Sequence, residues 1–246
     1  MVLGVISDIH GNATALEAAL QVLGAARVER VVCLGDIVGY GPDPTRCIEL
    51  VRESCEVVLA GNHDRGVLDH SMLGWFSDGA RSALKWTMRR LSDGDRAWLA
   101  SLPRQGTYGG VSLCHGSPSD PDAYLMSPQA AAFAMRACDE SVAFYGHTHT
   151  PVLYKIPHGQ TVDARDVTLP VGTPVELDVG IARWAVNPGS VGQPRDGDPR
   201  AALLTYDADR PSVTLHRAHY DIASVQVRMR RARLPRYLID RLPLGY

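Results

Sequence analysis

Five short apolar runs in this chain each end in a cluster of glycine and polar residues, and this repeat constrains the fold more than any other feature. Such a run, ended by a turn signal, is typical of a buried β-strand. The runs lead in turn to Asp8-Ile9-His10, Gly35-Asp36, Gly61-Asn62-His63-Asp64, His115-Gly116 and Gly146-His147-Thr148-His149. We therefore expect carboxylates, imidazoles and an amide at the C-terminal edge of one sheet, where open α/β sheets bind ligands.

The spacing of the first runs indicates a parallel βαβ unit. Asn12 is a good helix N-cap, and apolar residues then recur on one helical face before the second run begins. Residues 65–102 break this alternation with a predicted helical insertion, in which one helix covers 78–91 and a capping box at Ser92 opens another. Because the insertion directly follows a polar cluster, it either walls the site or covers a sheet face.

The second half of the chain has a different texture. Beyond Pro151, short β-prone runs alternate with Gly, Pro and Asp, which is typical of antiparallel strands and turns, and we expect them to form a second sheet. The predicted fold class is α/β, a four-layer α-β-β-α sandwich of two mixed β-sheets flanked by helices. No linker divides the chain, so residues 1–246 are expected to form a single domain. Residues 221–242 predict a basic C-terminal helix, for which a solvated face is favoured over nucleic-acid binding.

Composition narrows the environment and the partners. The net charge of −2 gives no reason to expect a nucleic-acid partner, and no run reaches the roughly 18 apolar residues of a membrane helix. The five cysteines form no Cys-x-x-Cys pair, which favours reduced thiols over a disulfide framework. No secretory signal is visible before the first run, so a cytoplasmic location is expected.

The polar clusters suit a pair of metal ions. Two divalent cations can acidify a bridging water and neutralise the phosphoryl oxygens of a phosphate ester. Asp36 is a lone carboxylate at a strand end and is well placed to bridge both ions, while Asn62 offers a neutral oxygen. The seven candidate ligands are Asp8, His10, Asp36, Asn62, His115, His147 and His149.

In their order, these clusters resemble the motifs of the calcineurin-like metallophosphoesterase superfamily: Asp-x-His, Gly-Asp, Gly-Asn-His-Asp/Glu, a His, and Gly-His-x-His. The later segment Asn187-Pro188-Gly189-Ser190 resembles the small bacterial phosphodiesterase-like subgroup, and it either braces the Gly-His-x-His loop or forms only a tight turn. The resemblance covers roughly residues 1–205. It has one departure, since Gly39 stands where many members have Asp, at a position that binds no metal in the family.

The resemblance implies two metal sites that share one aspartate. One ion would be bound by Asp8, His10, Asp36 and His149, and the other by Asp36, Asn62, His115 and His147. A hydroxide bridging the ions would attack phosphorus. His63 would be the general acid that protonates the leaving oxygen, with Asp64 orienting it.

The expected function is hydrolysis of phosphate esters, with small phosphodiesters favoured as substrates. Mn²⁺ is the favoured metal and Fe, Zn²⁺ or Ni²⁺ are alternatives, because mixed imidazole and carboxylate ligands suit several ions. Other functions stay open: a phosphomonoesterase (a protein Ser/Thr phosphatase or a dinucleoside tetraphosphatase), a nucleic-acid-binding protein, or a non-catalytic metal-bound scaffold. The intact His63 and the full ligand set argue against the scaffold. The oligomeric state also stays open, with a homodimer among the options.

Overall fold

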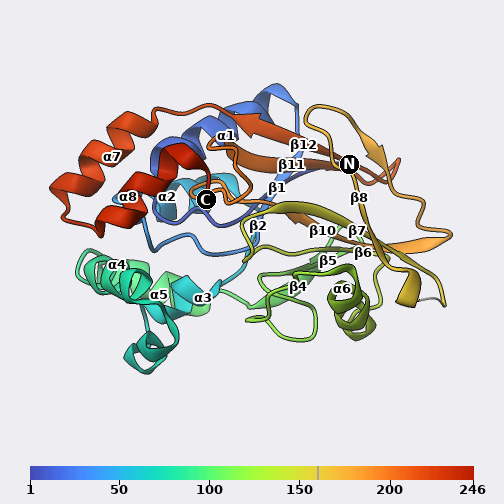
Figure 1. Ribbon diagram of the computed structural model, residues 1–246, viewed down its shortest axis with the longest axis horizontal. Coiled ribbons are helices and arrows are strands. Elements are labelled where there is room, and N and C mark those ends of the chain that lie inside the picture. The colour runs from blue at the N-terminus through green and yellow to red at the C-terminus, as the bar shows by residue number, and fades with distance from the viewer. Residues whose placement is uncertain (160) are drawn as a thin grey trace.

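Two six-stranded sheets face each other at the centre of the molecule (Figure 1). The structure, a computed structural model, describes residues 1–159 and 161–246. The first sheet has the strand order β3-β2-β1-β11-β12-β9, and the second has the order β4-β5-β6-β10-β7-β8. Each sheet is mixed, because β1 pairs in parallel with β2 and antiparallel with β11, while β10 pairs in parallel with β6 and antiparallel with β7.

Both halves of the chain contribute strands to both sheets. The first sheet contains β1 (Val2–Ile6), β2 (Arg30–Cys33), β3 (Val57–Val58), β9 (Val175–Glu176), β11 (Ala201–Asp207) and β12 (Ser212–Ala218). The second contains β4 (Gln105–Tyr108), β5 (Val111–Cys114), β6 (Val142–Phe144), β7 (Pro151–Pro157), β8 (Arg165–Val167) and β10 (Ala182–Pro188). The runs beyond Pro151, which were expected to form a second sheet, divide between the two: β7, β8 and β10 lie in the second sheet, whereas β9, β11 and β12 complete the first.

Eight α-helices and four short 3₁₀ helices lie within the described residues. The α-helices are α1 (Ala13–Ala25), α2 (Pro44–Ser54), α3 (Asn62–Gly66), α4 (Asp78–Met88), α5 (Asp93–Ser101), α6 (Pro128–Ala134), α7 (Ile222–Arg231) and α8 (Arg236–Arg241). The 3₁₀ helices are η1 (His70–Trp75), η2 (Met135–Ala137), η3 (Thr161–Asp163) and η4 (Leu242–Leu244). The predicted caps of α1 and α5 are present: the Asn12 side chain accepts from the Ala15 N–H, and Ser92 forms a capping box with Asp95. None of the helices in these ranges has the length and apolar character needed to cross a membrane.

Alternating side chains of the central strands account for the layers. Leu3, Leu113 and Phe144 pack between the two sheets, where they are shielded from water on both sides. Ile6 points the other way, into a cluster with α1 and α2, and Tyr145 points into a cluster with α6. The order of helices, first sheet, second sheet and α6 confirms the predicted four-layer sandwich (Figure 1). The five cysteines are all free, as predicted.

The C-terminal segment forms two helices, whereas one was expected. The chain leaves α7 through Arg233, which has a φ of 55°, and Pro235 cannot continue the preceding helix because it lacks an N–H. Val225 of α7 and Leu238 of α8 pack with Ala83 of α4 in one apolar cluster. The tail therefore packs onto the helical insertion, and its outer face is exposed.

Candidate metal centre

Loops from both sheets bring the candidate ligands together at one end of the sandwich. The ligands follow different elements: Asp8 and His10 come after β1, Asp36 after β2, Asn62 at the start of α3, His115 after β5, and His147 and His149 after β6. The prediction of a single sheet edge is thus wrong, because these strands belong to two sheets whose ends meet. A direct bond joins the two sets of loops, since the His147 backbone N–H donates to Asp8 Oδ2 at 3.0 Å.

Five of the seven candidate ligands have a left-handed backbone. Their φ angles are 55° at Asp8, 51° at His10, 53° at Asp36, 68° at His147 and 62° at His149. This conformation costs an L-residue about 1–2 kcal/mol, although Asp and His tolerate it better than most. It bends each loop sharply, so side chains separated by one residue turn toward the same point.

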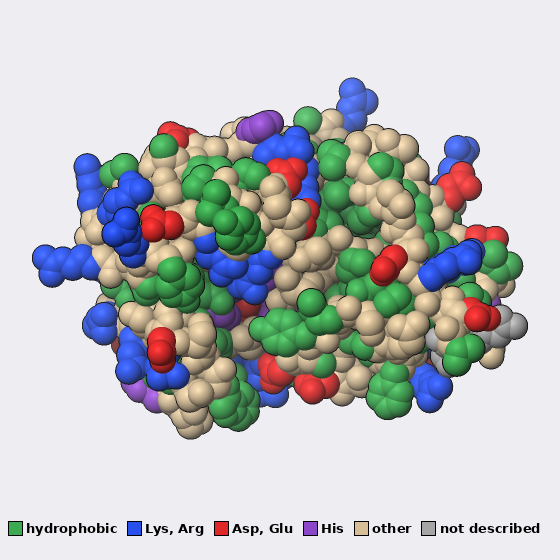
Figure 2. Space-filling model, viewed as in Figure 1, with side chains coloured by type: hydrophobic (Ala, Val, Ile, Leu, Met, Phe, Trp, Pro, Cys, Tyr) green, Lys and Arg blue, Asp and Glu red, His purple; other side chains and the backbone are tan. Residues whose placement is uncertain are grey.

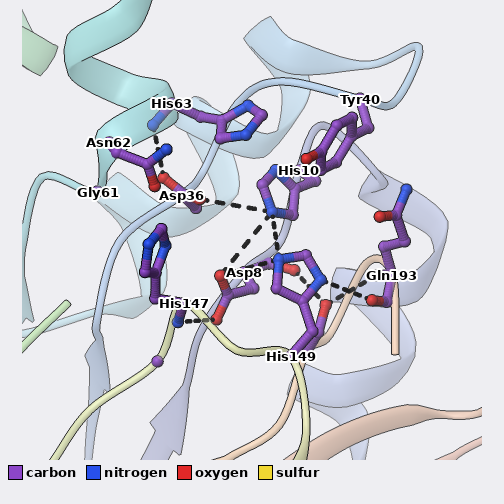
Figure 3. Close-up of polar contacts among 12 residues, drawn as sticks. Asp8, His10, Asp36, Tyr40, Gly61, Asn62, His63, His147, His149 and Gln193 are labelled. Atoms are coloured by element: carbon purple, nitrogen blue, oxygen red, sulfur yellow. Dashed lines mark hydrogen bonds and ion pairs between the residues drawn. The ribbon is translucent and has the colours of Figure 1, made fainter. Parts of the chain in front are cut away.

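Four buried side chains form the first ligand group (Figure 3). One ligand atom from each of Asp8, His10, Asp36 and His149 lies within 4.8 Å of the other three. His10 Nε2 lies 3.0 Å from His149 Nε2, and His149 Nε2 lies 3.3 Å from Asp8 Oδ1. The His149 Nδ1–H donates to the Gln193 carbonyl at 2.7 Å, which leaves the unprotonated Nε2 directed into the group.

These contacts fit a cation. Burial lowers the pKa of both His10 and His149, so both rings are neutral and present lone pairs. Asp8 Oδ1 is buried and has no hydrogen-bond partner within the described residues. Two imidazole lone pairs and an unpaired carboxylate oxygen in one dry place satisfy a divalent ion and repel each other without one.

The second group shares Asp36 with the first. Asp36, His115 and His147 offer ligand atoms within 4.8 Å of one another, and His115 Nε2 lies 3.2 Å from Asn62 Oδ1. The His115 Nδ1–H donates to the Leu34 carbonyl at 3.0 Å, so Nε2 faces the group. Carbonyl and carboxylate groups that fix a histidine tautomer in this way are common around metal sites.

Asp36 uses its two oxygens differently. Its Oδ1 accepts from the His63 backbone N–H at 2.8 Å, while Oδ2 lies 3.5 Å from His10 Nε2 and 3.4 Å from His115 Nε2. Oδ2 therefore faces both groups at once. Gly61 makes room for this arrangement, because a Cβ on it would lie 2.1 Å from Asp36 Oδ1.

Protons balance the charges of the cluster in the absence of a cation. Burial raises the pKa of Asp8 to about 6. Burial alone would lower the pKa of His115, but the Asp36, Asp8 and Asp64 carboxylates outweigh it and raise that pKa to about 9. An imidazolium at His115 thus compensates part of the charge of these carboxylates.

His63 lies next to the two groups and belongs to neither. Its ring is buried between Phe76 and Tyr40, with ring centroids 4.9 and 4.6 Å away. Its Nδ1 has no hydrogen-bond partner within the described residues. A Cβ at Gly39 would lie 2.6 Å from that Nδ1, so the glycine at the departure from the family motif gives the ring its space.

The structure gives Asp64 other partners than the expected one. Its Oδ1 accepts from the backbone N–H groups of Ile37 and Val38 at 2.9 and 3.1 Å, and its Oδ2 accepts from the Gly61 N–H at 3.0 Å. No bond to the His63 ring is present in the described part of the chain. Asp64 instead ties the loop after β2 to the start of α3, and so holds the Asp36 loop in place.

The segment at 187–190 braces two ligand loops. Asn187 Nδ2 donates to the Gly146 carbonyl at 2.7 Å, and the Ser190 hydroxyl donates to the Asp8 carbonyl at 2.7 Å. Of the two readings of this segment, bracing is the one that the contacts support. The backbone carbonyls of Gln193 and Leu34 also orient ligands, but a carbonyl group leaves no trace in the sequence.

A cleft of about 650 Å³ opens beside the cluster. It reaches His63, Asn62 and His147, and the helical insertion forms one wall, so the walling alternative for residues 65–102 holds. The C-terminal helix α8 contributes Tyr237 and Arg241 to the lining. The side chains lining the cleft are those of Tyr40, Asn62, His63, Met72, Trp75, Phe76, Ser77, Asp78, Ala80, Asp122, Tyr124, His147, Arg195, Tyr237 and Arg241, together with Gly79.

Comparisons with known proteins agree with this architecture. A family model described as the calcineurin-like phosphoesterase superfamily domain matches residues 1–209. The chain is 33% identical over 248 residues to an uncharacterized protein of Methanocaldococcus jannaschii, covering 99% of this chain and 98% of that one. A metallophosphoesterase from Sphaerobacter thermophilus has a TM-score of 0.88 at 40% identity, over 100% of this chain and 99% of that one. A hypothetical protein from Pyrococcus horikoshii has the same fold, with a TM-score of 0.80 at 22% identity and coverage of 100% and 98%.

Proposed function

The chain belongs to the calcineurin-like phosphoesterase superfamily, and on that premise we propose that it hydrolyses phosphodiesters with two divalent metal ions bound. The observation that carries this proposal is the pair of buried ligand groups that share Asp36 beside the cleft. When bound, such ions acidify water and neutralise phosphoryl oxygens. The family itself supports a phosphoester hydrolase, and the preference for diesters is our own step.

In this proposal each residue keeps the position described above. Asp8, His10, Asp36 and His149 hold one ion, and Asp36, Asn62, His115 and His147 hold the other. Mn²⁺ is the proposed metal, since harder carboxylate and amide oxygens accompany the imidazoles and no thiolate lies in either group.

His63 is the proposed proton donor to the leaving oxygen. Burial lowers its pKa to about 4, so the ring is neutral at pH 7 while the cleft holds no ester. An anionic ester next to the ring favours the imidazolium form and raises that pKa. The ring therefore gains the proton that it donates only when the substrate is in place.

The cleft favours diesters over monoesters as substrates because apolar side chains line it in more than one place beside the cluster. Trp75 and Phe76 line one wall and Tyr124 lines another, and the Tyr124 ring lies 3.8 Å from that of His147. A diester carries two organic groups and uses both apolar surfaces, whereas a monoester uses one. The volume of about 650 Å³ suits small substrates.

Three chromogenic or nucleotide substrates test the preference. With Mn²⁺ supplied, we expect kcat/KM for bis-p-nitrophenyl phosphate to exceed that for p-nitrophenyl phosphate by about tenfold or more, because only the diester fills both walls. Diadenosine tetraphosphate is the third substrate. A preference for the monoester or for the tetraphosphate would select one of the phosphomonoesterase alternatives, and no turnover of any would favour the scaffold.

Metal binding should also release protons. The pKa of His115 is raised to about 9 in the absence of a cation, so its ring carries a proton at pH 7 and must lose it to bind an ion. The apparent Mn²⁺ affinity should therefore rise by roughly tenfold per pH unit from pH 7 and level off near pH 9. Calorimetric titration in buffers of different ionisation enthalpy measures the released protons. A pH-independent affinity in this window would contradict the charge balance described for the cluster.

A further inference from the structure

Four charged side chains line the cleft, and the two acidic ones are already paired. Asp78 forms an ion pair with Arg81, and Asp122 forms one with Arg65. Both partners are arginines outside the set that lines the cleft. The charge left over in the cleft is thus that of its two arginines. Figure 2 shows Lys and Arg side chains gathered around a hollow of the surface, with a histidine below them.

Arg195 is held in place next to the first ligand group. Its backbone N–H donates to the His149 carbonyl at 3.2 Å, and its Nη2 donates to Gln193 Oε1 at 3.0 Å. The guanidinium lies 5.9 Å from the centre of the Tyr40 ring. Its Nε is buried and has no hydrogen-bond partner within residues 1–159 and 161–246. The guanidinium of Arg195 is therefore oriented by its bond to Gln193, while its Nε–H still lacks a hydrogen-bond acceptor.

Arg241 brings a second guanidinium to the same cleft from α8. Its Nε donates to a main-chain oxygen of Tyr246, the final residue of the sequence, and within the described residues no Asp or Glu side chain forms an ion pair with it. Burial lowers the pKa of Arg241, and the positive charge of Arg195 lowers it further. Both guanidinium groups line the same cleft, where their like charges repel each other, and an anion bound between them reduces this repulsion.

The position of Arg241 is fixed by packing. Tyr237, one turn earlier on α8, lies so close to α4 that a Cβ on Gly79 would fall 2.1 Å from its ring. Leu238 packs with Ala83 in the cluster that α8 shares with α4. Arg241 thus extends from a helix that is anchored on α4, which also lines the cleft.

We propose that Arg195 and Arg241 form a subsite for a second phosphate group, carried by one organic substituent of the ester whose scissile phosphate lies at the metal centre. The inference rests on the proposed diesterase function and names its substrate class. Guanidinium groups bind phosphate oxygens through paired, charge-assisted hydrogen bonds, and two of them match the charge of a phosphate monoester. Arg195 connects the subsite to the metal centre through its contacts with His149 and Gln193.

Matched esters test the subsite. The first is the p-nitrophenyl ester of thymidine 5′-phosphate, the second carries an added 3′-phosphate, and the third carries a 3′-O-carboxymethyl group. All release p-nitrophenol, so one assay reads them all. With Mn²⁺ bound, the unaltered protein should show kcat/KM about tenfold or more higher for the 3′-phosphorylated ester than for the plain one. Arg241→Gln and Arg195→Gln should each reduce this ratio to about one, and Arg241→Lys should keep part of it.

Arg236→Gln is the matched control. Arg236 lies on the same helix, its side chain is 92% exposed, and it does not line the cleft, so this variant should keep the full ratio. Thermal unfolding of each variant separates loss of the subsite from loss of the fold. Equal cleavage of the plain and 3′-phosphorylated esters by the unaltered protein would overturn the subsite, as would a preference for the carboxymethyl ester. Failure to release p-nitrophenol from any of the three would instead count against the proposed diesterase function.

Discussion

Replacing His63 by alanine is expected to lower kcat for bis-p-nitrophenyl phosphate by about 10²–10⁴-fold, the usual contribution of a positioned general acid. Both metal ions should stay bound. The ring lies outside the two ligand groups, and the contact that His63 makes to Asp36 comes from its backbone N–H, which alanine keeps. Steady-state kinetics with a parallel measurement of metal content by mass spectrometry gives both quantities.

His70→Ala is the control for this experiment. His70 is an exposed histidine in the same insertion and does not line the cleft, so its removal should leave kcat unchanged. If His63→Ala retained full turnover, the proton would have to come from elsewhere. If the variant lost its metal, the ring would be a support of the ligand groups and the low turnover would have a different cause.

Asp36→Asn should affect metal binding more than His63→Ala does, because it removes a negative charge that faces both ligand groups. Metal content is expected to fall from about two ions per chain to less than one, and kcat to fall by about 10³-fold or more, since both ions are needed for the chemistry. Single replacements on either side should be milder. His149→Ala removes a ligand only from the first group, and Asn62→Ala only from the second.

The amide that Asp36→Asn introduces can still accept from the His63 N–H through its carbonyl oxygen, so the loop should keep its shape. Circular dichroism and thermal unfolding in the presence of a chelator check this. Retention of one tightly bound ion in Asp36→Asn, with the other lost, would show that Asp36 serves a single site and that the shared-ligand arrangement is wrong.

The ligand loops could be predicted from sequence because the information for them is local. An apolar run predicts a strand, and Asp36 or His147 and His149 follow such runs within a few residues. The strand and the polar groups at its end can therefore be identified together. The structure brings all seven candidate ligands together, although their roles as ligands stay predictions. The N-caps of α1 and α5 could be predicted for the same reason, since a cap is defined by residues three positions apart in the sequence.

Sheet membership and the partners of Asp64 could not be predicted, because long-range packing decides them. The run that forms β11 is a short β-prone stretch between turn residues, as are those of β7 and β10, yet it pairs with β1 in the other sheet. Likewise, nothing in the tail sequence indicates that Arg241 reaches the cleft. Its place follows from the packing of α8 on Ala83, which is distant in sequence.

Because five of the candidate ligands have a left-handed backbone, selection for stability and selection for activity favour different residues at these positions. Glycine at His147, whose side chain makes no hydrogen bond within the described residues, would relieve about 1 kcal/mol or more of torsional energy and thereby raise the melting temperature. It would also delete a side chain on which the proposed chemistry depends. Selection for thermal stability without selection for turnover should therefore enrich glycine at these positions. The enriched variants should be inactive. Selection for activity therefore has to retain these side chains, although selection for thermal stability alone would replace them.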